Sequence, residues 1–107
     1  IDVHKRTFAL ANKTGGLSGP AVKPVAVRMV YEASRACSLP VIGMGGICTA
    51  QDAVEFMLAG ATAISVGTAN FHDPCATKKI IDGIEQYLRT YKIDDVKSLI
   101  GAVREAG

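Results

Sequence analysis

Two short apolar runs, each ending at a glycine and each followed by a helical pattern, constrain the fold of this chain most strongly. The first run is residues 41–44, and the second is residues 61–66. Short runs without charged residues are typical of parallel strands that are buried on both faces. Because such strands alternate here with amphipathic helices, the sequence predicts an α/β fold with a parallel sheet.

The first helical pattern covers residues 21–37 and precedes the first strand. Its apolar residues recur every three or four positions, which is the period of one face of a helix. Ser18 is a candidate N-cap for this helix, and Pro20 suits an early helical position. The residues that we expect to face the core are Val22, Val25, Ala26, Met29, Val30 and Ala33.

Three more helices are expected after the first strand. Thr49 is the predicted N-cap of a helix that ends at Gly60, and further helices are expected over residues 76–91 and 94–104, the last capped by an aspartate. The apolar residues expected to be buried in the first two of these helices are Val54, Met57, Leu58, Ile80, Ile81, Ile84, Tyr87 and Leu88.

The first twenty residues carry no strong helical or strand pattern. Residues 1–10 mix charged, β-branched and aromatic residues, which favours a short hairpin or an irregular arm. Residues 12–20, NKTGGLSGP, are dense in turn formers and are expected to form a loop. The chain opens on Ile1 with no initiator Met and no signal-peptide pattern, so we expect a piece of a longer protein or a chain whose beginning is missing.

Two strands do not make a complete parallel sheet, which needs helices on both faces or closure into a barrel. A (β/α)₈ TIM barrel takes about 250 residues. We therefore expect this 107-residue chain to be the C-terminal part of such a barrel, holding about its last two to three β/α units. Residues 1–107 would then belong to one domain.

Composition excludes several classes of function. The net charge of +2 is too small and too evenly spread to predict nucleic-acid binding. No apolar run approaches the roughly 20 residues of a membrane span. The three cysteines, Cys37, Cys48 and Cys75, lack the spacing of metal ligands, and their odd number suggests reduced thiols and a cytoplasmic protein. Cys48 beside the first glycine turn is conceivable as a reactive thiol, but a small residue at a helix start is the better-supported interpretation.

The glycine turns at the strand ends form the candidate binding site. Gly45 and Gly46 follow the first strand, and Gly67 and Thr68 follow the second. Glycine lets backbone N–H groups approach phosphate oxygens closely, and Thr68 adds a hydroxyl donor. Barrels often bind phosphate with the loops after strands seven and eight. One such turn is better explained by a tight connection, but two on consecutive strands, with a third glycine-rich loop upstream, favour phosphate binding.

Other candidate groups are few. Lys13, Lys23 and Arg28 are near the turns in sequence and would add positive charge, although a solvated surface is the better explanation for each. His72 is a candidate base, but a place on the outer rim, either hydrogen-bonded locally or exposed, fits it better. His4 is the other histidine, and no pair of carboxylates stands at a strand end. We therefore expect no catalytic residue and no metal ligand in this chain.

Three segments together resemble class 1 dihydroorotate dehydrogenase. They are NKTGGLSGP at 12–20, IGMGGI at 42–47 and VGTANF at 66–71, and the last is most similar to the type 1B catalytic subunit. The resemblance covers essentially the whole chain. It implies the C-terminal part of a (β/α)₈ barrel that binds flavin mononucleotide (FMN).

The same resemblance assigns roles to the glycine turns. Gly19 would contact FMN, Gly45 and Gly46 would bind its phosphate after the seventh strand, and Gly67 and Thr68 would bind it after the eighth. The turn chemistry had already indicated the last four residues. The role of Gly19 rests on the resemblance alone.

The resemblance also implies an activity. The family oxidises dihydroorotate to orotate in pyrimidine biosynthesis, with a cysteine base and hydride transfer to the flavin. Type 1B enzymes pass the electrons to a second subunit that carries FAD and an iron–sulfur cluster, with NAD as the final acceptor, and a homodimer is expected. The family's catalytic-cysteine loop, flavin-contacting lysine and substrate-binding asparagines are absent from this chain, and Cys37, Cys48 and Cys75 do not match that loop. The chain alone is therefore expected to be inactive.

Two alternatives stay open. One is another flavin- or phosphate-binding barrel, such as the related domain of dihydropyrimidine dehydrogenase, although the 12–20 loop favours the first interpretation. The other is a non-catalytic partial barrel whose exposed strand edges pair with another chain.

Overall fold

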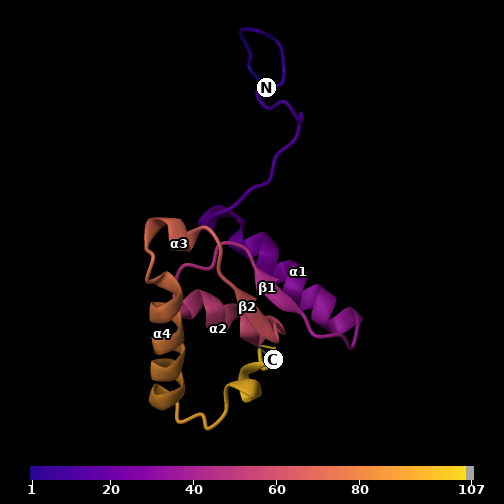
Figure 1. The fold of residues 1–107 in the computed structure, drawn as a ribbon. Helices are drawn as coiled ribbons and strands as arrows, with labels where there is room; N and C mark the ends of the chain where they lie inside the picture. Colours follow the sequence, from indigo (N-terminus) through magenta and orange to yellow (C-terminus); the bar gives the residue numbers. More distant parts are fainter. Residues whose placement is uncertain (106–107) are drawn as a thin grey trace.

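The computed structural model describes residues 1–105, which fold into alternating strands and helices with an extended N-terminal arm (Figure 1). Strands β1 and β2 pair in parallel, with Gly43 opposite Ile64, which confirms the predicted α/β fold. No helix of these residues is long and apolar enough to cross a membrane. The elements in chain order are η1 (Pro20–Val22), α1 (Lys23–Ala36), β1 (Ile42–Met44), α2 (Ala50–Ala59), β2 (Ala63–Ser65), α3 (Ala69–His72), α4 (Ala76–Thr90) and η2 (Val96–Leu99).

The N-terminal arm and the loop after it have the structure that the sequence predicts. Asp2 and Thr7 form an isolated antiparallel bridge, with N···O distances of 2.9 and 3.4 Å, so the arm begins as a small hairpin. Residues 8–18 then run without helix or strand to the body of the molecule (Figure 1).

The start of the first helix differs from the prediction. The chain first makes the short 3₁₀ turn η1, and α1 follows with Val22 as its N-cap and no side-chain cap. Gly19, at φ 92°, turns the chain into η1 and is its N-cap, so Ser18 lies one residue before the N-cap of η1 and four residues before that of α1. The prediction that Ser18 caps the helix is wrong. Pro20 opens η1, in agreement with its predicted early position.

Helix α2 begins and ends where the sequence indicated. Thr49 Oγ1 accepts the N–H of Asp52 at 3.2 Å, and the Asp52 carboxylate accepts the N–H of Thr49 at 3.1 Å, which completes a capping box. Gly60 ends the helix at φ 130°. Phe56 is the largest buried side chain of α2, and Val54 is buried as predicted, whereas Met57 and Leu58 are only half-buried.

The sheet is buried on one face and not on both as predicted. On the covered face, a Cβ atom at Gly43 would lie 2.8 Å from the Phe56 ring, so β1 packs directly on α2. On the other face, Ile42 and Met44 are each 62% exposed. The reason is that residues 1–105 contain no element that covers this second face.

Helix α4 packs closely on α2. A Cβ atom at Gly83 would collide with Ala50, so the two helices approach closely at this glycine. Ile80 is buried as predicted, but Ile81 is 60% exposed because only the face toward α2 is covered.

The predicted last helix over 94–104 is replaced by the short turn η2. Asp95 caps this turn by accepting the N–H of Lys97 at 2.9 Å, as an aspartate was expected to do. Beyond it, the N–H of Gly101 bonds to Met57 O at 2.9 Å, and the N–H of Val103 bonds to Leu58 O at 3.2 Å. The tail thus satisfies carbonyl groups at the end of α2 instead of continuing as a helix.

Candidate functional site

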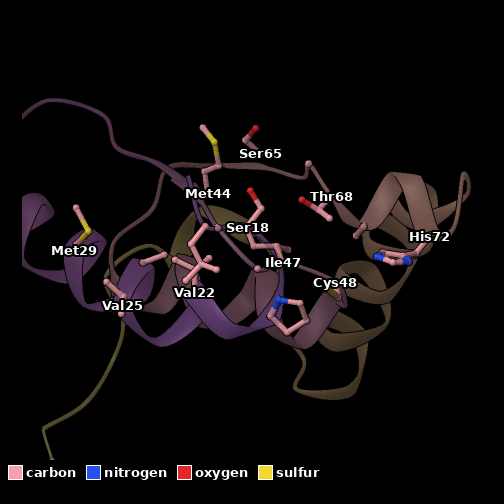
Figure 2. Close-up of a pocket in the computed structure, with 18 residues that line it drawn as sticks. Ser18, Val22, Val25, Met29, Met44, Ile47, Cys48, Ser65, Thr68 and His72 are labelled. Atoms are coloured by element: carbon pink, nitrogen blue, oxygen red, sulfur yellow. The ribbon is translucent and has the colours of Figure 1, made fainter. Parts of the chain in front are cut away.

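Both glycine turns open into a single cavity of about 510 Å³ at the carboxyl ends of the two strands (Figure 2). This volume is within the range of small-molecule binding pockets. All five residues that the sequence singled out line the cavity: Gly19, Gly45, Gly46, Gly67 and Thr68. The fold therefore brings together three segments that are separated along the chain.

The turn after β1 requires glycine for the fold itself. Gly45 and Gly46 have φ values of 123° and 73°, which L side chains rarely adopt. A Cβ atom at Gly46 would also lie 2.7 Å from Gly19 O and 3.0 Å from Lys23 N. Within residues 1–105, the N–H groups of Gly45 and Gly46 donate no hydrogen bond, so both stay available to a ligand.

The turn after β2 is held by hydrogen bonds that do not use the N–H groups of Gly67 and Thr68. The N–H groups of Asn70 and Phe71 bond to the carbonyls of Gly67 and Thr68, at 3.0 Å each, and Asn70 Nδ2 bonds to Val66 O at 2.9 Å. Thr68 is the N-cap of α3, but its hydroxyl makes no capping bond. In the described part of the chain, the N–H groups of Gly67 and Thr68 donate no hydrogen bond.

The two turns lie beside each other because β1 and β2 are neighbours in one parallel sheet. Neighbouring strands are about 4.8 Å apart, so the donors of both turns face one small volume. Four unpaired backbone N–H groups and one hydroxyl are the kind of donor set that binds an anion.

The cations near the turns in sequence do not reach the cavity. Lys13 lies over the Phe8 ring in the arm, and the Arg28 side chain pairs with Glu32 at 3.1 Å on the exposed side of α1. Lys23 turns toward α2 and pairs with two carboxylates there. Solvated surface was therefore the right interpretation for Lys13 and Arg28, and the donors of the cavity are backbone groups.

Several lining residues were not identified from the sequence. Val25 and Met29 were expected in the core but are 58% and 64% exposed, and they line the cavity along α1 (Figure 2). Ser18 and His72 also line it. The available signal was the spacing of Val22, Val25 and Met29, which occupy one edge of the apolar stripe, away from the buried Ala26 and Val30.

The cysteines give no sign of special chemistry. All three are free and exposed, and Cys48 lines the cavity with its N–H bonded to Asp52 Oδ2 at 3.0 Å. This geometry fits a small residue just before a helix. Among residues 1–105, no three His, Cys, Asp or Glu side chains are grouped to hold a metal ion.

Comparison with known proteins decides the family. The family model described as dihydroorotate dehydrogenase matches residues 1–88. The chain belongs to the dihydroorotate dehydrogenase family. Its predicted resemblance to the type 1B enzyme is also confirmed, because curated relatives carry the name "Dihydroorotate dehydrogenase B (NAD(+)), catalytic subunit".

Two of these relatives illustrate the extent of the match. The protein of Lachnoclostridium phytofermentans is 60% identical over 104 residues, which are 97% of this chain and 35% of the relative. The protein of Geotalea uraniireducens is 63% identical over 103 residues, which are 96% of this chain and 34% of the relative. The chain thus spans about a third of the length of the curated relatives that it matches.

Solved structures agree with the fold. The DHODH of Eimeria tenella, crystallised in complex with ferulenol, superposes with a TM-score of 0.77 at 29% identity. The superposition covers 88% of this chain and 26% of the other. The expectation of a partial (β/α)₈ barrel is confirmed, while the place of this portion at the C-terminal end of the barrel stays a prediction.

Proposed function

We propose that this chain supplies the phosphate end of an FMN site in an enzyme that oxidises dihydroorotate to orotate in pyrimidine biosynthesis. Two findings support this function. The relatives that match the chain are named as catalytic subunits of dihydroorotate dehydrogenase B. The cavity between the two glycine turns also presents the donor set that a phosphate group needs.

The space at Gly67 carries the proposal. A Cβ atom at this position would meet no heavy atom of the chain within 4 Å, and its φ lies outside the left-handed region. The fold therefore tolerates a side chain at residue 67. Glycine at the rim of this cavity is instead explained by a ligand that must approach the backbone N–H group closely.

The rest of the cavity fits FMN as well. Gly45, Gly46 and Thr68 provide further donors for the phosphate oxygens, and Gly19 closes the same cavity from the loop before η1. The side chains of Val25, Met29 and Met44 give it an apolar wall of the kind that binds ring systems.

The residues of this chain bind and orient, and the reacting groups are assigned to the cofactor and to other parts of the enzyme. When bound, FMN would supply the hydride acceptor for the oxidation of dihydroorotate. The donors of both turns would fix the phosphate end and so set the position of the whole cofactor. No proton transfer is assigned to the described side chains.

The name shared by the relatives also supports a second subunit. A catalytic subunit named with NAD(+) fits an electron-transfer partner that carries FAD and an iron–sulfur cluster, with NAD as the acceptor. We extend the proposal to this partner, to a homodimer of the catalytic subunit and to a cytoplasmic location.

The test is anaerobic reduction of the full-length natural protein. We expect the purified protein to have a flavin spectrum that dihydroorotate bleaches, with one orotate formed for each flavin reduced. Dihydrouracil serves as the control substrate. A protein that takes up no FMN, or whose flavin is bleached by dihydrouracil and not by dihydroorotate, would overturn the proposal.

A further inference from the structure

The turn after β1 lies directly against the start of α1, and Lys23 is at the junction. The backbone of Gly46 packs on Gly19 O and on the N and Cβ atoms of Lys23, where an added Cβ would lie 2.7 to 3.0 Å away. The room for the N–H groups of Gly45 and Gly46 is therefore set by where α1 begins.

The side chain of Lys23 then crosses from α1 to α2. Its Nζ is 2.7 Å from Asp52 Oδ1 and 2.9 Å from Glu55 Oε2. The Lys23 and Asp52 side chains are only 28% and 16% exposed, so this pair is more shielded from water than the other ion pairs of the described residues. This ion pair joins α1 and α2 through two residues that are 29 positions apart in the chain.

The same carboxylate also holds the end of the glycine turn. Asp52 Oδ2 accepts the N–H of Cys48 at 3.0 Å and the N–H of Thr49 at 3.1 Å. Burial alone would raise the pKa of Asp52, but the hydrogen bonds from Lys23 and from these two N–H groups outweigh it and lower that pKa. The hydrogen bond to Asp52 is the main cause that raises the pKa of Lys23, so both partners are charged at neutral pH.

We propose that the ion pair of Lys23 with Asp52 and Glu55, here called the clasp, positions the Gly45–Gly46 turn for the phosphate group. Lys23 fixes one side of the turn through its backbone, and Asp52 fixes the other through Cys48 and Thr49. The ammonium group of Lys23 is bound to two carboxylates and is not offered to the ligand. This inference rests on the proposed FMN site and assigns Lys23 and Asp52 as positioning residues for it.

A purely electrostatic role predicts a different pattern of effects. If these charges acted on the phosphate only at a distance, Lys23→Met would weaken FMN binding and Asp52→Asn would strengthen it, because the latter removes a negative charge. The clasp predicts that both substitutions weaken binding, since each releases the turn.

The experiment measures FMN and riboflavin affinity of the full-length apoprotein by quenching of flavin fluorescence. Riboflavin lacks the phosphate group, so it reports on the rest of the site. We expect Lys23→Met and Asp52→Asn each to lower FMN affinity on the order of tenfold, the loss expected for one hydrogen bond to a charged group. Riboflavin affinity should not change, and Lys23→Arg should retain most of the FMN affinity.

The matched control is Lys78→Met, which breaks an exposed ion pair with Asp82 of 2.8 Å on α4 and should leave both affinities unchanged. Asp52→Asn that binds FMN more tightly, or Lys23→Met with an unchanged ratio of FMN to riboflavin affinity, would overturn the clasp. The double variant should lose no more than the larger single loss, and additive losses would also overturn it. If the unsubstituted protein binds FMN no tighter than riboflavin, the proposed phosphate site itself fails, whatever the variants do.

Discussion

The turn after β1 and the turn after β2 both contain glycine, but protein atoms crowd only the first. Gly46 has a φ of 73° and lies against Gly19 O and Lys23, so its missing side chain is a requirement of packing. Gly67 has open space around it and needs no unusual φ. Packing of the fold therefore explains the glycine at residue 46, whereas at residue 67 the proposed function offers the explanation, namely close approach of a ligand.

The largest expected effect comes from Gly46→Ala. The added methyl group would collide with the backbone of Gly19 and would force an L residue into a left-handed conformation. We expect a loss of about 2–3 kcal/mol in the free energy of unfolding, measured with urea, together with loss of FMN binding. An alanine variant of normal stability would show that packing does not require this glycine.

Gly67→Ala should separate binding from stability. The methyl group meets no protein atom, so the free energy of unfolding should be unchanged or higher by up to about 1 kcal/mol. FMN affinity should fall by roughly 10- to 100-fold, because the phosphate loses a close backbone donor, while riboflavin affinity stays the same. Equal losses for FMN and riboflavin would place this turn away from the phosphate group.

Local signals in the sequence predicted much of this fold. The capping box at Thr49 and Asp52, the end of α2 at Gly60 and the two apolar runs all involve residues that are close in the chain. The convergence of the two turns was also predictable, because neighbouring parallel strands end at the same edge of a sheet. The local signals share a dependence on short-range geometry, and the convergence follows from the pairing of two consecutive strands.

The features that the sequence did not predict depend on contacts between residues that are far apart in the chain. The ion pair of Lys23 with Asp52 spans 29 positions, and nothing around Lys23 distinguishes it from a solvated lysine. The tail beyond Leu99 does not form the predicted helix because the N–H groups of Gly101 and Val103 donate hydrogen bonds to the carbonyls of Met57 and Leu58. Ile42 carries an apolar side chain that the described residues leave uncovered, so an apolar run alone did not reveal which face is buried.

The smallest expected effect is a pH dependence that only the first turn should show. Asp52 has a lowered pKa in the folded protein, so the stability it contributes is present above its ordinary pKa of about 3.9 and is lost as the pH falls through the lowered value. At neutral pH, Asp52→Asn should cost on the order of 1 kcal/mol of unfolding free energy, because the pair is partly exposed.

This difference between the unsubstituted protein and Asp52→Asn should shrink below about pH 4, since protonation of the carboxyl group has then the same effect as the substitution. Urea unfolding of both proteins between about pH 7 and pH 3 measures it. Gly67→Ala is the comparison, because no carboxylate among residues 1–105 holds the turn after β2. The difference that this variant shows from the unsubstituted protein should stay constant over the same range. A difference for Asp52→Asn that is equally constant would mean that the carboxylate charge does not hold the turn after β1.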